Sequence, residues 1–190
     1  HHFDILSRHL KSIAEKRAIR IWCSAAPTGE APYSIAMTAV EAFNSLAPPV
    51  SIVASDLDTN VLTQGERGIY PAERVARLSP EQLSRHFLKG AGAQDSSVEV
   101  RPELRRLITF KRISLLDAVW PVQGPLDVIF CRNVMIYFDK QTQYDILKKF
   151  VPLLREDGLL FAGHSESFLH AGDLFRPLGR TVYARAERKK

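Results

Sequence analysis

Short apolar runs alternate with amphipathic segments along most of the chain, and this pattern predicts the order of its elements. Strand-type runs occur at residues 19–23, 51–55, 107–111, 127–131 and 158–162. Apolar residues have helical spacing at 3–16, 32–43, from 59 onward and at 141–154, and residues 174–186 resemble two strands joined through 177–179. Continuous apolar runs are typical of buried parallel strands whose two faces are covered by helices. The pattern therefore predicts an α/β fold with a doubly wound sheet.

Residues 68–106 interrupt this alternation. They contain a helix-like stretch at 79–88 and a strand-like stretch at 98–100. A connection this long between two strands is usually functional or forms a small subdomain. We expect one catalytic domain over residues 1–190, with 68–106 as an inserted subdomain that has a short β component.

Composition narrows the class of protein. The chain has 190 residues, of which 45% are apolar and 25% charged, as in one compact soluble domain. The sequence shows neither an apolar run of bilayer length nor a signal peptide, so we expect a cytoplasmic protein, with a monomer as the simplest state. A net charge of +5 favours an acidic partner such as nucleic acid, an anionic membrane surface or an acidic protein. An ordinary basic surface is equally compatible with this charge.

The cysteine pattern disfavours a metal site. Cys23 and Cys131 both lie in strand-like runs, and the sequence has no C-x-x-C motif and no cluster of cysteine and histidine. We expect two buried free thiols in a reducing compartment, and no structural metal.

Polar and small residues follow the first two strands, where a doubly wound sheet binds its ligands. The loop at 24–30 is made of small residues but contains only Gly29, so it is not the G-x-G-x-x-G fingerprint of dinucleotide-binding proteins. After the second strand, Asp56 is placed to accept both hydroxyl groups of an adenosine ribose, while Asp58 is suited to the local turn. Either aspartate could instead serve only as a helix cap. Together, loop and carboxylate favour an adenosine-type cofactor.

A third group of polar residues follows the strand at 127–131. Arg132, Asn133 and Tyr137 lie among apolar neighbours there, either as ligand contacts or as a buried network that holds the strand end. The segment lacks the Asp/Asn-Pro-Pro-Tyr motif typical of DNA methyltransferases that act on amino groups, which disfavours nucleic acid as the substrate.

Four segments together resemble the chemotaxis receptor glutamate O-methyltransferases. They are SAAPTGEAPYS at 24–34, ASDLD at 54–58, FCRNVMIYFDK at 130–140 and LLFAGHSES at 159–167. The third and fourth segments are very specific together, and the resemblance extends over essentially the whole chain. It implies a Rossmann-like class I methyltransferase fold with S-adenosylmethionine as methyl donor and S-adenosylhomocysteine as product.

The resemblance also implies roles for individual residues. Glu30 and its loop are expected near the methionine part of the cofactor, Asp56 at the ribose, and Tyr137 and Arg132 at the acceptor. The full set of expected cofactor contacts is Ala26, Thr28, Glu30, Asp56, Ser114, Leu115, Arg132 and Asn133. The expected partners are cytoplasmic helices of chemoreceptors, and in some members of the family a peptide at the receptor C-terminus docks on the inserted subdomain.

The sequence departs from the family pattern at several positions. Glu30 is followed by Ala31 where many members have two acidic residues, and Pro27 replaces a commoner serine. Ser114-Leu115 stands where an Asn-Leu pair usually meets the adenine edge, which leaves the contact of Ser114 open. Members of the family also have a helical N-terminal domain that carries an active-site arginine. We therefore expect a truncated chain or fragment, in which His1-His2 is native sequence rather than the remnant of a tag.

The expected chemistry needs no general base, because a glutamate side chain with a pKa of ~4.3 is already ionised. We expect Tyr137 to orient the acceptor carboxylate, and Arg132 either to attract it or to organise the strand end.

Basic residues in or beside the insertion could steer an acidic partner, or be an ordinary solvated face; they are Arg67, Arg74, Arg77, Arg85 and Lys89. Two alternatives remain, namely a methyltransferase of the same fold that acts on a small molecule or nucleic acid, and a cofactor-binding module without catalysis.

Overall fold

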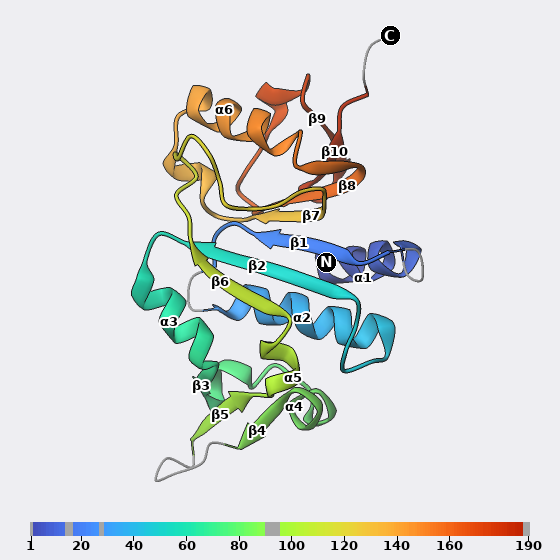
Figure 1. Cartoon of the computed structure of the whole chain (residues 1–190), viewed down its shortest axis with the longest axis vertical. Coiled ribbons are helices and arrows are strands. Elements are labelled where there is room, and N and C mark those ends of the chain that lie inside the picture. The colour runs from blue at the N-terminus through green and yellow to red at the C-terminus, as the bar shows by residue number, and fades with distance from the viewer. Residues whose placement is uncertain (1, 14–16, 27–28, 90–95, 188–190) are drawn as a thin grey trace.

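A seven-stranded sheet forms the centre of the molecule (Figure 1). The computed structural model describes residues 2–13, 17–26, 29–89 and 96–187. Within these residues the strand order is β6-β2-β1-β7-β8-β10-β9. The strands are β1 (Ile19–Cys23), β2 (Val50–Asp56), β6 (Ile108–Arg112), β7 (Leu126–Cys131), β8 (Leu154–Ala162), β9 (Phe175–Gly179) and β10 (Val182–Arg185).

The direction of the strands fixes where loops meet. β1 lies between β2 and β7 and pairs in parallel with both, so that Ile21 faces Ile52 on one side and Val128 on the other. β6 and β8 extend this parallel arrangement, whereas β10 runs antiparallel to β8. The chain moves outward from β1 through β2 to β6 and then returns to the opposite side of β1 as β7. The point between β1 and β7 is therefore the topological switch point, where such sheets bind their ligands.

Alternation of side chains along the strands divides the core between the two faces of the sheet. Ile21 points to the face covered by α1 (His2–Ile13) and α2 (Glu30–Phe43). Its neighbour Trp22 points to the face covered by α6 (Lys140–Phe150) and by residues 113–122. The Trp22 ring is completely buried and meets the rings of Trp120 and Phe150 edge to face, at 5.1 and 5.5 Å between centroids.

A second, smaller sheet lies at the opposite end of the molecule from α6 (Figure 1). Its order is β3-β5-β4, with β3 (Ile69–Pro71), β4 (Phe87–Lys89) and β5 (Ser97–Val100) all antiparallel. α3 (Thr59–Arg67) precedes it, and it is accompanied by a 3₁₀ turn η2 (Ala72–Val75), α4 (Pro80–His86) and α5 (Pro102–Arg105). The completely buried His86 bonds through Nε2 to the Glu41 carboxylate of α2 at 3.1 Å, which ties this unit to the main domain.

The sequence predicts the strands of the main sheet, but it does not predict β3 or β4, and β8 begins at Leu154 rather than at the expected 158. Three further features differ from expectation. The helix expected to reach 154 ends at Phe150, because Pro152 cannot continue it, and Leu154 instead begins β8. The helix expected to reach 88 ends at His86, and Phe87–Lys89 pairs with β5. The joint expected at 177–179 belongs to β9. The turn is made by Arg180 and Thr181, whose φ values of 54° and 58° are positive.

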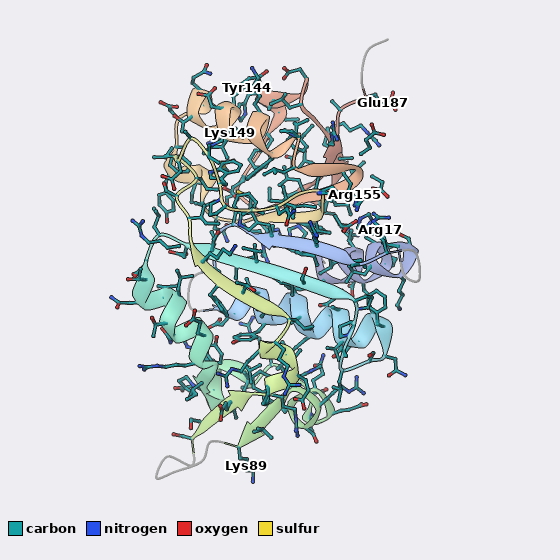
Figure 2. The ribbon with its side chains drawn as sticks, in the orientation of Figure 1. Arg17, Lys89, Tyr144, Lys149, Arg155 and Glu187 are labelled. Carbon is teal, nitrogen blue, oxygen red and sulfur yellow. The ribbon has the colours of Figure 1, made fainter. Side chains whose placement is uncertain are left out.

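The buried carboxylate of Asp127 lies at the amino ends of the central strands, opposite the switch-point loops. Asp127, which is 1% exposed, accepts from Arg17 Nη2 at 2.5 Å and from the backbone N–H of Arg20 at 3.0 Å. Arg155 Nε lies 3.4 Å from the same carboxylate, and Figure 2 shows Arg17 and Arg155 close together at these strand ends.

None of the helices in the described residues is long and apolar enough to cross a bilayer.

Candidate functional site

Serine side chains join the carboxyl ends of the three central strands. The backbone N–H and the hydroxyl group of Ser24 both donate to the carbonyl oxygen of Phe130, at 2.9 and 3.1 Å. The Ser55 hydroxyl donates to the carbonyl oxygen of Ser24 at 3.2 Å and accepts from Trp22 Nε1 at 3.0 Å. These bonds fix the loops after β1, β2 and β7 relative to one another at the switch point.

The two aspartates after β2 have different structural roles. Asp58 is the N-cap of α3 and accepts from the backbone N–H groups of Asn60 and Val61 at 2.8 and 3.4 Å. Asp56 ends β2, and its Oδ1 accepts from the N–H of Asp58 at 3.0 Å. Cys23 of β1 pairs with Ala54 of β2, so Asp56 lies two residues beyond this pair at the carboxyl end of the sheet. Burial raises the pKa of the Cys23 thiol, and the Asp56 charge adds to this effect. Asp56 is thus positioned for a ligand that lies across β1 and β2.

The loop after β1 leads directly into α2. Ala26 is buried, and its carbonyl oxygen accepts from the N–H of Gly29 at 3.2 Å. Gly29 has a φ of 82°, and a Cβ there would lie 2.8 Å from the Tyr70 hydroxyl, so a glycine is required. Glu30 begins α2 and accepts from Arg74 Nη1 at 2.5 Å. Thr28 lies outside the described residues, so its expected cofactor contact stays a prediction.

A buried glutamate organises the loops after β7 and β8. Glu166 is 5% exposed and accepts three backbone N–H groups: those of Asn133 at 2.6 Å, Met135 at 2.8 Å and Gly163 at 2.8 Å. Asn133 has a positive φ of 60°, and a Cβ at Gly163 would lie 2.3 Å from its Oδ1. The carboxylate therefore holds two loops in a backbone arrangement that they would not adopt independently.

Arg132 directly follows β7 and precedes Asn133, whose backbone N–H is bound by Glu166. Burial lowers the pKa of the His2 imidazole, and the Arg132 charge acts in the same direction. Burial raises the pKa of the Cys23 thiol, and the Arg132 charge opposes this shift. Within the part of the chain that the structure describes, the Arg132 Nε–H is buried without a hydrogen-bond partner. Most buried donors have a partner, and this one belongs to the residue that directly follows β7, whose carboxyl end lies at the switch point.

The Tyr137 side chain is largely exposed to solvent. The residue belongs to the 3₁₀ turn η3 (Met135–Tyr137), and its side chain is 78% exposed. Met135 in the same turn is completely buried and is bound by Glu166, so the turn is anchored while the phenol projects outward. This suits a group that meets an approaching macromolecule.

Ser114 and Leu115 serve the turn after β6. The Ser114 hydroxyl accepts from the N–H of Leu116 at 3.2 Å, and the Ser114 N–H donates to Asp117 Oδ2 at 3.2 Å. The Leu115 side chain is 6% exposed and packs in the core. Their contact with adenine stays a prediction, and it would have to use the backbone for Leu115.

The two cysteines are buried free thiols, as predicted. Burial raises the pKa of each to about 12, so both stay protonated at neutral pH. A thiol in this state is a poor nucleophile, which excludes these side chains from covalent catalysis.

His2 is part of the folded domain and lies beside the loop after β8. Its Nε2 bonds to the carbonyl oxygen of Arg180 at 2.9 Å and to Thr181 Oγ1 at 3.0 Å, and its ring stacks on that of His164. Burial lowers the pKa of His2, so the imidazole is neutral near pH 7. The start of the chain is thereby held at the edge of the candidate site.

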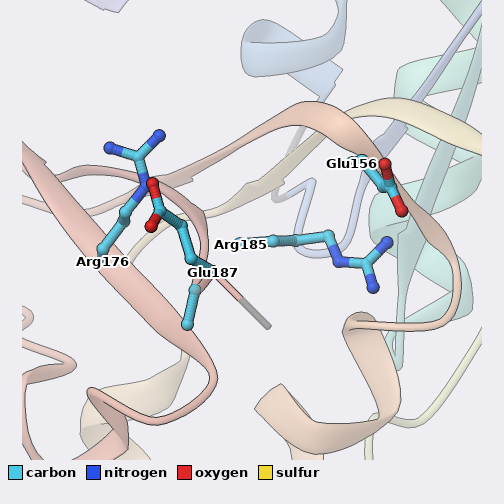
Figure 3. Close-up of a pocket in the computed structure, with 5 residues that line it drawn as sticks. Glu156, Arg176, Arg185 and Glu187 are labelled. Atoms are coloured by element: carbon cyan, nitrogen blue, oxygen red, sulfur yellow. The ribbon is translucent and has the colours of Figure 1, made fainter. Parts of the chain in front are cut away.

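A polar pocket on the surface lies away from the strand ends described above. It is lined by Glu156, Arg176, Arg185, Ala186 and Glu187 (Figure 3). Arg185 donates to the carbonyl oxygen of Leu154 at 3.0 Å, at the start of β8. The pocket therefore lies near the amino end of β8, whereas the switch point is at the carboxyl ends of the strands. We exclude it as the candidate site for this reason.

Comparison with known proteins identifies the domain. The sequence profile described as "CheR methyltransferase, SAM binding domain" matches residues 1–184. The chain belongs to this family. The expected fold and cofactor class are thereby confirmed, since the family's domain is defined by binding of S-adenosylmethionine.

Curated relatives are similar over nearly the whole chain. It is 51% identical to "Chemotaxis protein methyltransferase 2" of Pseudomonas aeruginosa over 98% of this chain and 67% of that protein. It is 48% identical to "Chemotaxis protein methyltransferase" of Salmonella typhimurium over 100% of this chain and 65% of that protein. The chain thus spans about two thirds of the length of these CheR relatives.

A solved structure agrees with the fold. The TehB-like SAM-dependent methyltransferase of Corynebacterium glutamicum superposes with a TM-score of 0.52 at 13% identity, over 95% of this chain and 86% of that one. The family segment at 159–167 contains Glu166, but the sequence predicts no role for this residue. No signal in the sequence distinguishes a carboxylate that binds three backbone N–H groups from an exposed one.

Proposed function

We propose that this CheR domain transfers a methyl group from S-adenosylmethionine to glutamate side chains of chemoreceptors. The observation that carries the proposal is the buried Arg132 Nε–H without a partner in the described residues. Arg132 follows β7 and Asp56 ends β2, and both strands pair with β1 at the switch point. A carboxylate from the ligand or the acceptor would satisfy this donor. The names of the relatives support chemotaxis as the setting. The proposal includes the cytoplasm as the compartment of the reaction.

The cofactor, when bound, supplies an electrophilic methyl group on a sulfonium. The domain then has to orient the acceptor rather than remove a proton, because the glutamate carboxylate is already charged near pH 7. Asp56 and the loop at 24–30 would hold the cofactor, with Asn133 beside it. Tyr137 would donate a hydrogen bond to the acceptor carboxylate, and Arg132 would attract that carboxylate or fix the strand end. Orientation of this kind supplies ~7–11 kcal/mol of a barrier in favourable cases.

Transfer of labelled methyl groups tests the proposal. Cofactor labelled in its methyl group would be incubated with receptor signalling fragments, with a small carboxylic acid and with DNA. The experiment should use the full-length protein as well as this domain, because the relatives are longer. Label on receptor protein that is released by mild base indicates glutamate esters. Label on the small acid or on DNA alone would refute the receptor as substrate, and binding without transfer would favour a regulatory module.

Tyr137→Phe should lower kcat for receptor methylation by about 10- to 100-fold, which corresponds to the loss of one hydrogen bond to a charged group. Affinity for S-adenosylhomocysteine should be unchanged, because the phenol is 78% exposed and its turn is held by Glu166 rather than by the hydroxyl. Tyr144→Phe, which removes a hydroxyl bound to Asp173, is a matched control. Equal turnover in Tyr137→Phe and the control would remove the orienting role.

We further propose that the small sheet docks a receptor tail peptide on the free edge of β4, with the domain acting as a monomer. A groove beside β4 is lined by Leu83, Phe87, Leu88, Lys89 and Arg101, among others. Main-chain pairing with such an edge, plus side-chain pockets, is a common mode of peptide recognition. Leu88→Asp should weaken binding of a receptor tail peptide at least tenfold, measured by fluorescence anisotropy. Ile69→Asp on the opposite edge strand β3 is the control, and equal losses in both variants would contradict the site.

A further inference from the structure

The Arg74 side chain connects the inserted unit to the cofactor loop. Its Nη1 donates to Glu30 Oε1 at 2.5 Å, although the two residues are 44 positions apart in the sequence. Arg74 belongs to η2, next to the small sheet, whereas Glu30 begins α2 directly after the loop at 24–29. The side chains are 46% and 52% exposed, so this ion pair can exchange with other charged groups.

A small cavity lies beside this ion pair. The residues that matter for its chemistry are Glu30, Tyr33, Tyr70, Arg74, Arg77 and Phe87. Tyr70 also packs against Gly29 of the cofactor loop, and burial raises the pKa of its hydroxyl, which therefore stays protonated. Aromatic walls with two arginines suit the side chain of an aspartate or glutamate, since a guanidinium binds a carboxylate through two parallel hydrogen bonds.

This inference rests on the proposed function, under which two cations compete for the Glu30 carboxylate. The methionine part of the cofactor carries an ammonium group, and the Glu30 carboxylate is the expected group near it. Arg74 forms an ion pair with the same carboxylate. Binding of the cofactor ammonium to Glu30 must therefore displace or share the guanidinium, which lowers affinity for the cofactor.

We propose that the cavity between α2 and the inserted unit binds an acidic side chain of the protein partner. The partner carboxylate takes Arg74 away from Glu30 and thereby increases affinity for the cofactor. Because coupling between two ligands is reciprocal, bound cofactor also increases affinity for the acidic segment. Docking of an acidic receptor and loading of the methyl donor are linked through one arginine.

Calorimetry with three ligands tests the competition. Arg74→Ala should tighten S-adenosylmethionine and S-adenosylhomocysteine by about two- to fivefold, the range expected for one exposed ion pair. Methylthioadenosine, which has no ammonium group, should be unaffected. Arg77→Ala removes the same charge from the same cavity and should change none of the three. Weaker binding in Arg74→Ala, or an equal change for all three ligands, would overturn the inference.

A peptide titration tests the occupant. The probe is an acetylated and amidated octapeptide of alternating glutamate and alanine, compared with its glutamine counterpart at low ionic strength. The glutamate peptide should raise affinity for S-adenosylhomocysteine in the wild-type domain, and not in Arg74→Ala. No effect in the wild type, or the same effect in the variant, would overturn the docking site. Failure of the wild type to bind any cofactor would instead refute the proposed function, so the two failures are distinguishable.

Discussion

Asp56→Asn is expected to weaken binding of S-adenosylhomocysteine by about 100-fold. The carboxylate can accept from both ribose hydroxyl groups, and a hydrogen bond to a charged group contributes about 1.5–3 kcal/mol. The amide oxygen of asparagine can still accept from the N–H of Asp58, which in the wild type bonds to Oδ1 at 3.0 Å. The turn is therefore kept, while the second acceptor is replaced by a donor. Isothermal calorimetry on the purified domain measures the change.

The neighbouring aspartate provides a control. Asp58→Ala removes the N-cap of α3, with its bonds to the N–H groups of Asn60 and Val61, and should lower the free energy of unfolding by about 1 kcal/mol. Its effect on cofactor affinity should be small. The two substitutions should therefore have different effects: Asp56→Asn changes cofactor affinity, and Asp58→Ala changes the free energy of unfolding. If both variants lose affinity equally, Asp56 acts through the turn and not through the ribose.

Glu166→Ala is expected to lower the free energy of unfolding by about 3 kcal/mol or more. The side chain is 5% exposed and satisfies three backbone N–H groups, and each buried donor left without a partner costs about 1–3 kcal/mol. Water entering the space left by the side chain would offset part of this loss. Urea denaturation followed by circular dichroism measures the change.

The same variant should also lose cofactor affinity, because Asn133 and Gly163 would no longer be held together. Glu156→Ala makes the same change in net charge at an exposed position of β8 and should leave both stability and affinity near the wild-type values. Glu166→Gln keeps one acceptor oxygen and should give an intermediate loss of stability. A Glu166→Ala domain as stable as Glu156→Ala would show that the three hydrogen bonds contribute nothing net.

The apolar pattern of the chain determined most of the fold. The central parallel strands were predictable, because a strand buried on both faces needs a continuous apolar run such as 128–131, and its short length distinguishes it from a helix. Local chemistry also located the turn at Asp56 and Asp58. Boundaries failed where local signals compete, as at Phe87–Lys89, where pairing with β5 overrides a helical pattern.

The candidate site was only partly readable. Sequence motifs indicated the polar residues after β1, β2 and β7, since in a parallel sheet these positions share one edge. They could not indicate how far each residue projects, so the 78% exposure of Tyr137 and the burial of Leu115 required the structure. Exposure depends on which elements pack beside a residue, and that information is spread over the whole chain.

Contacts between distant segments were decided by the tertiary structure alone. Glu166 meets the N–H of Asn133 across 33 residues, and Arg74 meets Glu30 across 44. A carboxylate or guanidinium has the same local sequence signal whether it is solvated or bound, because its partner is selected by the packing of loops and not by its neighbours in the chain. The sequence by itself determined the sheet, the family motifs and the cofactor class. Only the folded arrangement determined which charged groups hold the site together and which remain for ligands.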